Sequence, residues 1–223
     1  MHQRKSKKVL IYLFLLMIVS SIGNNSINNF KFSKIEKINI SGLDQLEKQI
    51  LQDKLNKISL DNIFFVEKNK IIKLINSYNI IEKFIVFKKY PSAIDIKIES
   101  TTFLAKININ GKNFLIGSNG KLIANKLDHN ELPFIFGKPN IKEFLKFKRT
   151  MDRSKFNYNK IDNLYFFPSN RWDIKFKENI LLKLPVNFTL EDLDRLYEFL
   201  ENYNGKNFTV VDFRIEDQII LNE

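Results

Sequence analysis

The sequence predicts an α+β protein: one N-terminal helix, then a small strand-helix-helix-strand-strand unit, then a larger, mostly antiparallel β region with flanking helices. Three observations support this prediction. A single long apolar run lies near the N-terminus, helical periodicity gives way to alternation before residue 100, and hairpin turns follow beyond it. The 223 residues are 44% hydrophobic and 27% charged, which is typical of a globular chain.

The apolar run at residues 9–22 follows four basic residues at positions 4–8. A basic flank of this kind stays in the cytoplasm and directs the following chain outward, so we expect everything after residue 23 to be exported. Fourteen helical residues reach about 21 Å, less than the hydrocarbon core of roughly 30 Å. Length alone favours a removable signal peptide slightly over a short retained anchor.

The first folded unit is predicted from periodicity. Its expected elements are a strand that stops at Ser41-Gly42, a helix over 43–58, a helix over 66–78, and strands over 84–87 and 94–98. Leu43, Leu46 and Ile50, continued by Leu55 and Ile58, follow helical spacing and are expected on one buried face of the first helix. Such a unit packs both helices on one face of a small sheet.

Beyond residue 106 the pattern is one of hairpins. Asn110-Gly111 and Asn119-Gly120 each separate two apolar runs, and Asn-Gly pairs favour turns in which both central residues have positive φ. Another hairpin is expected over residues 172–184. Thr189 with Asp192 has capping-box spacing and predicts the start of a helix, after which residues 208–215 and 218–221 are expected as strands.

Composition excludes several functional classes. Without cysteine, neither disulfides nor thiolate metal sites can form. The net charge of +11 is spread over single lysines, and only 6 of the 36 basic residues are arginine, which argues against nucleic-acid binding. His129 is the one histidine outside the leader, and its polar surroundings predict a solvated loop residue and not a catalytic base. We therefore expect that the protein is not an enzyme and that it has no cofactor, metal site or small-molecule substrate.

The ordered segments together resemble the bacterial cell-division family FtsQ, called DivIB in Gram-positive organisms. Six motifs in the family's order carry the resemblance: Ile40-Ser-Gly42, Val86-Phe-Lys-Lys-Tyr-Pro91 before an alternating strand, Phe114-Leu-Ile-Gly-Ser-Asn-Gly120, Leu132-Pro-Phe-Ile-Phe-Gly137, Arg171-Trp-Asp-Ile-Lys-Phe176 with Leu184-Pro185, and Val211-Asp-Phe-Arg214. Asn170 replaces a usual arginine, Asn179 replaces a usual glycine, and Ser100-Thr-Thr102 replaces an expected Arg-x-Pro. These departures affect only the expected turn geometry.

The resemblance implies a type II inner-membrane protein at the division septum, with its N-terminus in the cytoplasm and its bulk in the periplasm. It reverses the signal-peptide preference in favour of a retained anchor. The implied organisation is a cytoplasmic tail at 1–8, a transmembrane signal-anchor at 9–23, a linker at 24–34, a POTRA domain at 35–100 and a β domain at 101–223. Members of this family act as divisome scaffolds that join FtsB and FtsL and influence septal peptidoglycan synthesis through FtsW and FtsI.

The resemblance also places candidate partner-binding residues. The family docks FtsB by adding a strand to the edge formed by its last β-strand, and an uncovered edge has the unpaired backbone groups for this. The positions expected to contact an FtsB-like partner are Arg214, Ile215, Asp217, Ile219 and Leu221. In the POTRA domain, Ile85, Phe87 and Lys89 are expected to contact other division proteins. Trp172 is expected in the core.

Two functions of other classes stay open. An outer-membrane assembly or secretion factor also carries POTRA units, but it would have several of them before a barrel, and no run of amphipathic barrel strands is present. A secreted hydrolase would need a carboxylate-lined cleft. The acidic pairs Glu191-Asp192 and Glu216-Asp217 are instead typical of a helix start and of surface charge.

Overall fold

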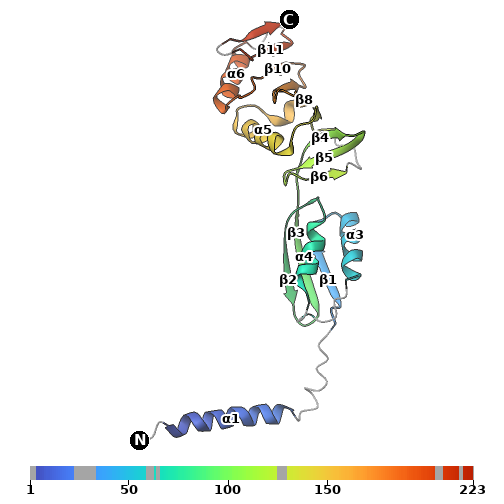
Figure 1. Ribbon diagram of the computed structural model, residues 1–223, viewed down its shortest axis with the longest axis vertical. Coiled ribbons are helices and arrows are strands. Elements are labelled where there is room, and N and C mark those ends of the chain that lie inside the picture. Colours follow the sequence, from blue (N-terminus) through green and yellow to red (C-terminus); the bar gives the residue numbers. More distant parts are fainter. Residues whose placement is uncertain are drawn as a thin grey trace. The chain divides into compact units, whose positions relative to one another are not determined.

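The computed structural model describes residues 4–22, 34–58, 63, 66–124, 130–203, 208–215 and 218–222, and the chain divides into two compact units. Among the described residues, the first contains those up to residue 75, including 4–22, together with 84–98, and the second contains 76–83 and the residues from 99 onward. Figure 1 shows the elements of each unit. The proposed limits of 35–100 and 101–223 stay predictions.

The N-terminal apolar run forms part of α1 (Arg4–Ile22). Across the described residues, no helix has both the length and the apolar character needed to cross a membrane. The transmembrane segment expected at 9–23 is therefore not confirmed.

The first unit has the expected order of elements. They are β1 (Lys37–Ser41), α3 (Gln45–Asn56), α4 (Lys68–Asn76), β2 (Ile81–Lys89) and β3 (Ala93–Ser100). The sheet order is β1-β3-β2, with β1 parallel to β3, so the last strand lies between the other two. The side chains of Ile94, Ile96 and Ile98 on β3 are buried, which identifies the face of the sheet that belongs to the core.

The buried face of α3 differs from the prediction. Leu51 and Leu55 are buried, whereas the side chain of Leu46 is 64% exposed and that of Ile50 is 39% exposed. The helix carries two apolar stripes, and only the one through Leu51 and Leu55 lies in the core. The prediction is therefore confirmed for Leu55 and was wrong for Leu46 and Ile50. The start of α3 agrees with capping rules, because the Asp44 carboxylate accepts a hydrogen bond from the backbone N–H of Glu47 at 2.8 Å.

The second unit is built on one large sheet. Its strands are β4 (Phe103–Ile109), β5 (Lys112–Gly117), β6 (Leu122–Ala124), β7 (Phe134–Phe136), β8 (Ile161–Phe166), β9 (Trp172–Phe176), β10 (Leu181–Lys183), β11 (Val210–Asp212) and β12 (Ile220–Asn222). Within the described residues the order is β12-β11-β10-β9-β8-β7-β4-β5-β6. Antiparallel pairs predominate as predicted, but β7 is parallel to both β4 and β8, and β10 is parallel to β11.

Two helices, α5 (Ile141–Arg153) and α6 (Leu190–Asn202), supply one side of the core of this unit. Thr189 and Asp192 form the predicted capping box at the start of α6. The ring of Phe147 on α5 stacks on Trp172 of β9 at 4.7 Å between centroids, and Trp172 is only 4% exposed, so the core position expected for it is confirmed. Both helices therefore lie on the face of the sheet to which Trp172, Ile174 and Phe176 point.

Of the two predicted Asn-Gly turns, one has the expected backbone conformation and the other does not. Asn110 and Gly111 have φ of 53° and 78°, which is the predicted pair of positive values. Gly120 has φ of 73°, but Asn119 is not in the positive region; its side chain instead accepts a hydrogen bond from the backbone N–H of Lys121. The second Asn-Gly turn therefore has a different geometry from the first.

Candidate functional site

The candidate site lies at the C-terminal end of the large sheet, where β12 is the edge strand. Within the described residues β12 pairs only with β11, through Val210–Asn222, Val211–Leu221 and Asp212–Ile220. The other side of β12 faces no strand of the described chain. An edge of this kind presents backbone N–H and C=O groups to a possible partner strand.

Cross-strand register divides the side chains of this region into two faces. Leu164, Ile174, Leu182, Val211 and Leu221 form one row across β8 to β12, and the first four members are completely buried. The neighbouring row, on the opposite face, contains Tyr165, Asp173, Lys183, Asp212 and Ile220. Because α5 and α6 cover only the first face, the second is the polar and charged face of the sheet.

Arg214 follows β11 and is held by a carboxylate of the same chain. Its Nε donates to the two carboxylate oxygens of Asp212 at 2.8 and 3.0 Å, and its backbone N–H also bonds to Asp212. This hydrogen bond from Arg214 holds the pKa of the Asp212 carboxyl below its ordinary value and raises the pKa of the arginine. The Arg214 side chain remains 42% exposed, so its N–H groups can still donate hydrogen bonds to a second anion.

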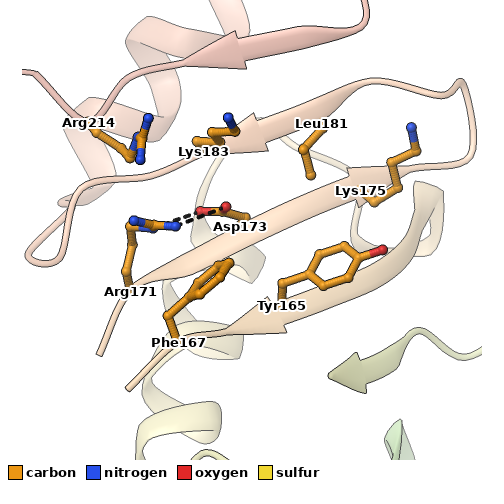
Figure 2. A pocket seen from close by; sticks show the side chains of 8 residues that line it. All are labelled: Tyr165, Phe167, Arg171, Asp173, Lys175, Leu181, Lys183 and Arg214. Carbon is orange, nitrogen blue, oxygen red and sulfur yellow. Dashed lines mark hydrogen bonds and ion pairs between the residues drawn. The ribbon is translucent and has the colours of Figure 1, made fainter. Parts of the chain in front are cut away.

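Next to Arg214, an open groove of about 410 Å³ runs over the polar face of β8, β9 and β10. Figure 2 shows Arg171 and Arg214 at the same end of this groove and Lys175 at the other. Its lining is basic and aromatic, and consists of Tyr165, Phe167, Arg171, Asp173, Lys175, Leu181, Lys183 and Arg214.

Arg171 is fixed in this groove by two neighbours. Its Nε donates to Asp173 at 3.1 Å, and its guanidinium lies over the ring of Phe167 at 4.2 Å from the centroid. Burial raises the pKa of the Asp173 carboxyl, although the arginine opposes that effect. Both arginines of the groove are thus partly neutralised by an acid of this chain, whereas no side-chain ion pair involves Lys183 among the described residues.

The structure places four of the five candidate edge residues in one region, and Asp217 lies outside the described residues. Arg214 and Ile215 are exposed, with Ile215 at 50%. Ile219 is half-buried and packs against the core, while Leu221 is 37% exposed at the end of the buried row. Ile219 and Leu221 therefore belong partly to the core of the sheet, so less of their surface is available to a partner.

Sequence reasoning missed Ile220, which is 49% exposed on the polar face opposite Asp212. The signal was present: along a strand, residues 219 and 221 point to one face and residue 220 to the other. It also missed the groove residues Tyr165, Phe167 and Lys183, because their proximity depends on the register of three strands.

Comparisons with known proteins identify the family of this chain. A family model described as "POTRA domain, FtsQ-type" matches residues 33–99, and one described as "Cell division protein FtsQ/DivIB, C-terminal" matches residues 105–214. The chain belongs to the FtsQ/DivIB family. The second match ends at Arg214, so β12 lies beyond the part of the chain that it covers.

Two relatives are both named "Cell division protein DivIB" and come from Clostridium botulinum. The protein from strain Hall is 24% identical over 208 residues, which is 91% of this chain and 74% of the relative. The protein from strain Loch Maree is 25% identical over 133 residues, which is 60% of this chain and 50% of the relative. A solved structure of the major extracytoplasmic domain of DivIB from Geobacillus stearothermophilus, described as its trans isomer, matches with a TM-score of 0.33 and 13% identity. It covers 48% of this chain and 99% of that one.

Two of the positions that depart from the family motifs, Asn170 and Asn179, lie in the connections on either side of β9. Asn170 and Asn179 have φ of 61° and 69°, in the left-handed region that glycine and asparagine tolerate best. At position 179, asparagine replaces a usual glycine and keeps the conformation that the hairpin between β9 and β10 requires.

The candidate residues of the POTRA domain lie on β2, the strand at one edge of its sheet. Ile85 is 57% exposed and Phe87 is 46% exposed, and Lys89 is also exposed, so the three share the solvent face of the strand. The amine of Lys97 on β3 lies 5.8 Å from the centroid of the Phe87 ring. About half of each apolar side chain therefore remains exposed to solvent.

His129, the one histidine of the folded region, lies outside the described residues. Within the described part of the chain there is no group of three or more His, Cys, Asp or Glu side chains arranged to hold a metal ion.

Proposed function

We propose that this FtsQ/DivIB member is a non-enzymatic scaffold of the divisome that binds an extended segment of an FtsB-like partner on β12. The observation that supports the proposal most is the position of β12 at the edge of the sheet, with Ile220 half exposed on the strand and Ile215 half exposed before it. Strand addition would pair the open backbone of β12, and the partner side chains would cover these two residues.

The charges near β12 suggest the chemistry of the partner. Arg214, Arg171 and Lys183 lie on the polar face of the sheet, and two acids of the same chain partly offset them. A partner segment with a carboxylate near Arg214 would share the guanidinium with Asp212 in a charge-assisted network. The arginine would lose little side-chain entropy on binding because Asp212 already fixes it.

A charge test separates this role of Arg214 from a purely structural one. Arg214→Gln removes the cation without adding the like charge that Arg214→Glu would place beside Asp212. We expect about 2–3 kcal/mol weaker binding of an FtsB homologue, measured by calorimetry with the full-length protein in detergent. Asp212→Asn keeps the cation but removes the carboxylate that fixes it, so this variant should weaken binding less than Arg214→Gln does.

The matched control is Arg149→Gln, because Arg149 is an exposed arginine on α5. It should bind the FtsB homologue as the wild type does. An affinity of Arg214→Gln equal to that of the control would contradict the docking of an acidic partner at this position.

We further propose that the POTRA domain contacts other division proteins through Ile85, Phe87 and Lys89. Exposed apolar side chains on an edge strand are costly in a free protein and are often covered by a partner. Phe87→Asp should reduce recruitment of the protein to the septum in a fluorescent-fusion assay. Normal recruitment by a variant with wild-type stability would count against this surface.

The scaffold is proposed to act at the inner membrane of the division septum, where it would join FtsB and FtsL homologues and influence FtsW and FtsI. Its anchor at residues 9–23 remains a prediction, tested by alkaline carbonate extraction of membranes. An anchored protein stays in the pellet after extraction, and a mature N-terminus at Asn24 would instead show cleavage. Anchoring would raise the effective concentration of partners held in the same membrane.

A further inference from the structure

A second groove lies in the first unit, beside β1 and not beside the strand β2 that carries Ile85, Phe87 and Lys89. It has a volume of about 320 Å³ and runs between β1 and α3. Five consecutive residues, 36–40, form one wall, and Lys48, Gln52 and Asn56 line the other. β1 is the outer strand of its sheet in the described residues and pairs only with β3.

The helix wall is a regular polar stripe. Lys48, Gln52 and Asn56 follow i, i+4 spacing, which brings them onto one line along α3, next to the buried line of Leu51 and Leu55. None of the three side chains hydrogen-bonds or pairs with another side chain of the described residues. Gln52 is nevertheless half-buried, so its amide is held at the groove without a hydrogen bond to any residue that the structure describes.

The dimensions of the groove fit a short extended peptide. Positions 48 to 56 span about 12 Å of helix at 1.5 Å per residue. Five strand residues span about 16 Å at 3.3 Å per residue. Four or five residues of an added strand would therefore run the length of the groove, with their backbone on β1 and every second side chain towards α3.

The charges define which side chains would face the helix. Lys48 and Lys37 are exposed cations of the groove, while the acid Glu36 already accepts a hydrogen bond from the hydroxyl of Ser92 at 3.4 Å. An acidic side chain fits opposite Lys48, and amide or hydroxyl side chains fit opposite Gln52 and Asn56. The pattern is acidic-x-polar-x-polar.

We propose that the β1–α3 groove is a second strand-acceptor site, which binds an extended segment of a partner protein with an acidic residue opposite Lys48. This site is separate from β12 and from the Ile85–Lys89 surface. Strand addition would complete the open edge of β1, and the two amides of α3 would select the register. The scaffold could then hold two extended partner segments at once.

The test uses the full-length, ¹⁵N-labelled protein and the synthetic peptide Thr-Glu-Val-Gln-Val-Asn-Thr, whose Glu, Gln and Asn share one face of a strand. We expect saturable shifts of the amide signals of residues 36–40 and of the side-chain amides of Gln52 and Asn56. Lys48→Glu should weaken binding about five- to tenfold. A peptide with Lys in place of its Glu should bind Lys48→Glu more tightly than it binds the wild type.

The control is Lys54→Glu, which makes the same charge change on α3 outside the groove residues and should leave peptide affinity unchanged. Shifts confined to residues 220–222, or equal losses in Lys48→Glu and Lys54→Glu, would overturn the proposal. The absence of any saturable shift at millimolar peptide concentration would also overturn the proposal. Self-association that is lost in Lys48→Glu would identify a second copy as the occupant and would also refute the partner assignment. Because the β12 variants leave this groove intact, failure here is distinguishable from failure of the FtsB-like docking.

Discussion

Two exposed isoleucines, Ile220 on β12 and Ile215 before it, give a prediction whose size follows from the structure. Ile215 and Ile220 are 50% and 49% exposed, so about half of each side chain remains to be buried by a partner strand. Complete burial of an isoleucine stabilises by about 1.5–3 kcal/mol, and burial of the remaining half is thus worth about 1 kcal/mol for each residue. Either Ile→Thr change keeps a β-branched side chain and should weaken partner binding about fivefold.

The double variant with Ile215→Thr and Ile220→Thr should lose about 2 kcal/mol, or roughly 30-fold in affinity, if the two contributions add. The assay is calorimetry of the full-length protein with an FtsB homologue. Val186→Thr is the control, because Val186 is 47% exposed but lies between β10 and α6. An unchanged affinity in the double variant, or an equal loss in the control, would refute strand addition at β12.

Three further predictions concern stability. Phe147→Ala should lower the free energy of unfolding by about 3–5 kcal/mol in urea titrations, because Phe147 is 2% exposed and stacks on Trp172; a loss below 1 kcal/mol would show that the core collapses around the cavity. Gly42→Ala should cost far more than Gly111→Ala: both have positive φ, but a Cβ at 42 would lie 1.7 Å from the backbone oxygen of Ile98, and one at 111 would meet nothing within 4 Å. Equal melting temperatures for these two variants would contradict the close approach. The lowered pKa of Asp212 means that its pair with Arg214 stabilises the fold above the ordinary carboxyl pKa and that this contribution is lost as pH falls through the folded pKa; unfolding free energies measured from pH 6 to pH 3 should therefore fall more steeply in the wild type than in Asp212→Asn, and parallel curves would disprove the linkage.

Arg171 and Arg214 differ from ordinary surface cations because each pairs with a largely buried carboxylate on the polar face of the sheet. Arg171 has its acid buried at 5% side-chain exposure, and Arg214 has its acid at 14%. A carboxylate with so little exposure is costly to desolvate, and a nearby cation offsets part of that cost. Each arginine thus contributes to the fold and at the same time presents an exposed edge to solvent, so mutagenesis of either should be accompanied by a stability measurement.

The sequence by itself determined the elements that depend on neighbouring residues. The capping box of Thr189 and Asp192, the positive φ at Asn110-Gly111, and the alternation that buries Trp172, Ile174 and Phe176 all follow from interactions within a few residues. The order of elements in the first unit was predictable for the same reason.

Only the tertiary structure decided which strands become neighbours. Parallel insertion of β7 between β4 and β8, the choice of Leu51 and Leu55 over Leu46 and Ile50, and the groove beside Arg214 all depend on pairings between distant segments. Local periodicity shows that a strand or an apolar stripe exists, but it does not show what will pack against it. That choice depends on the free energy of burying the whole set of surfaces together, and it left β12 at the edge and Ile220 half exposed.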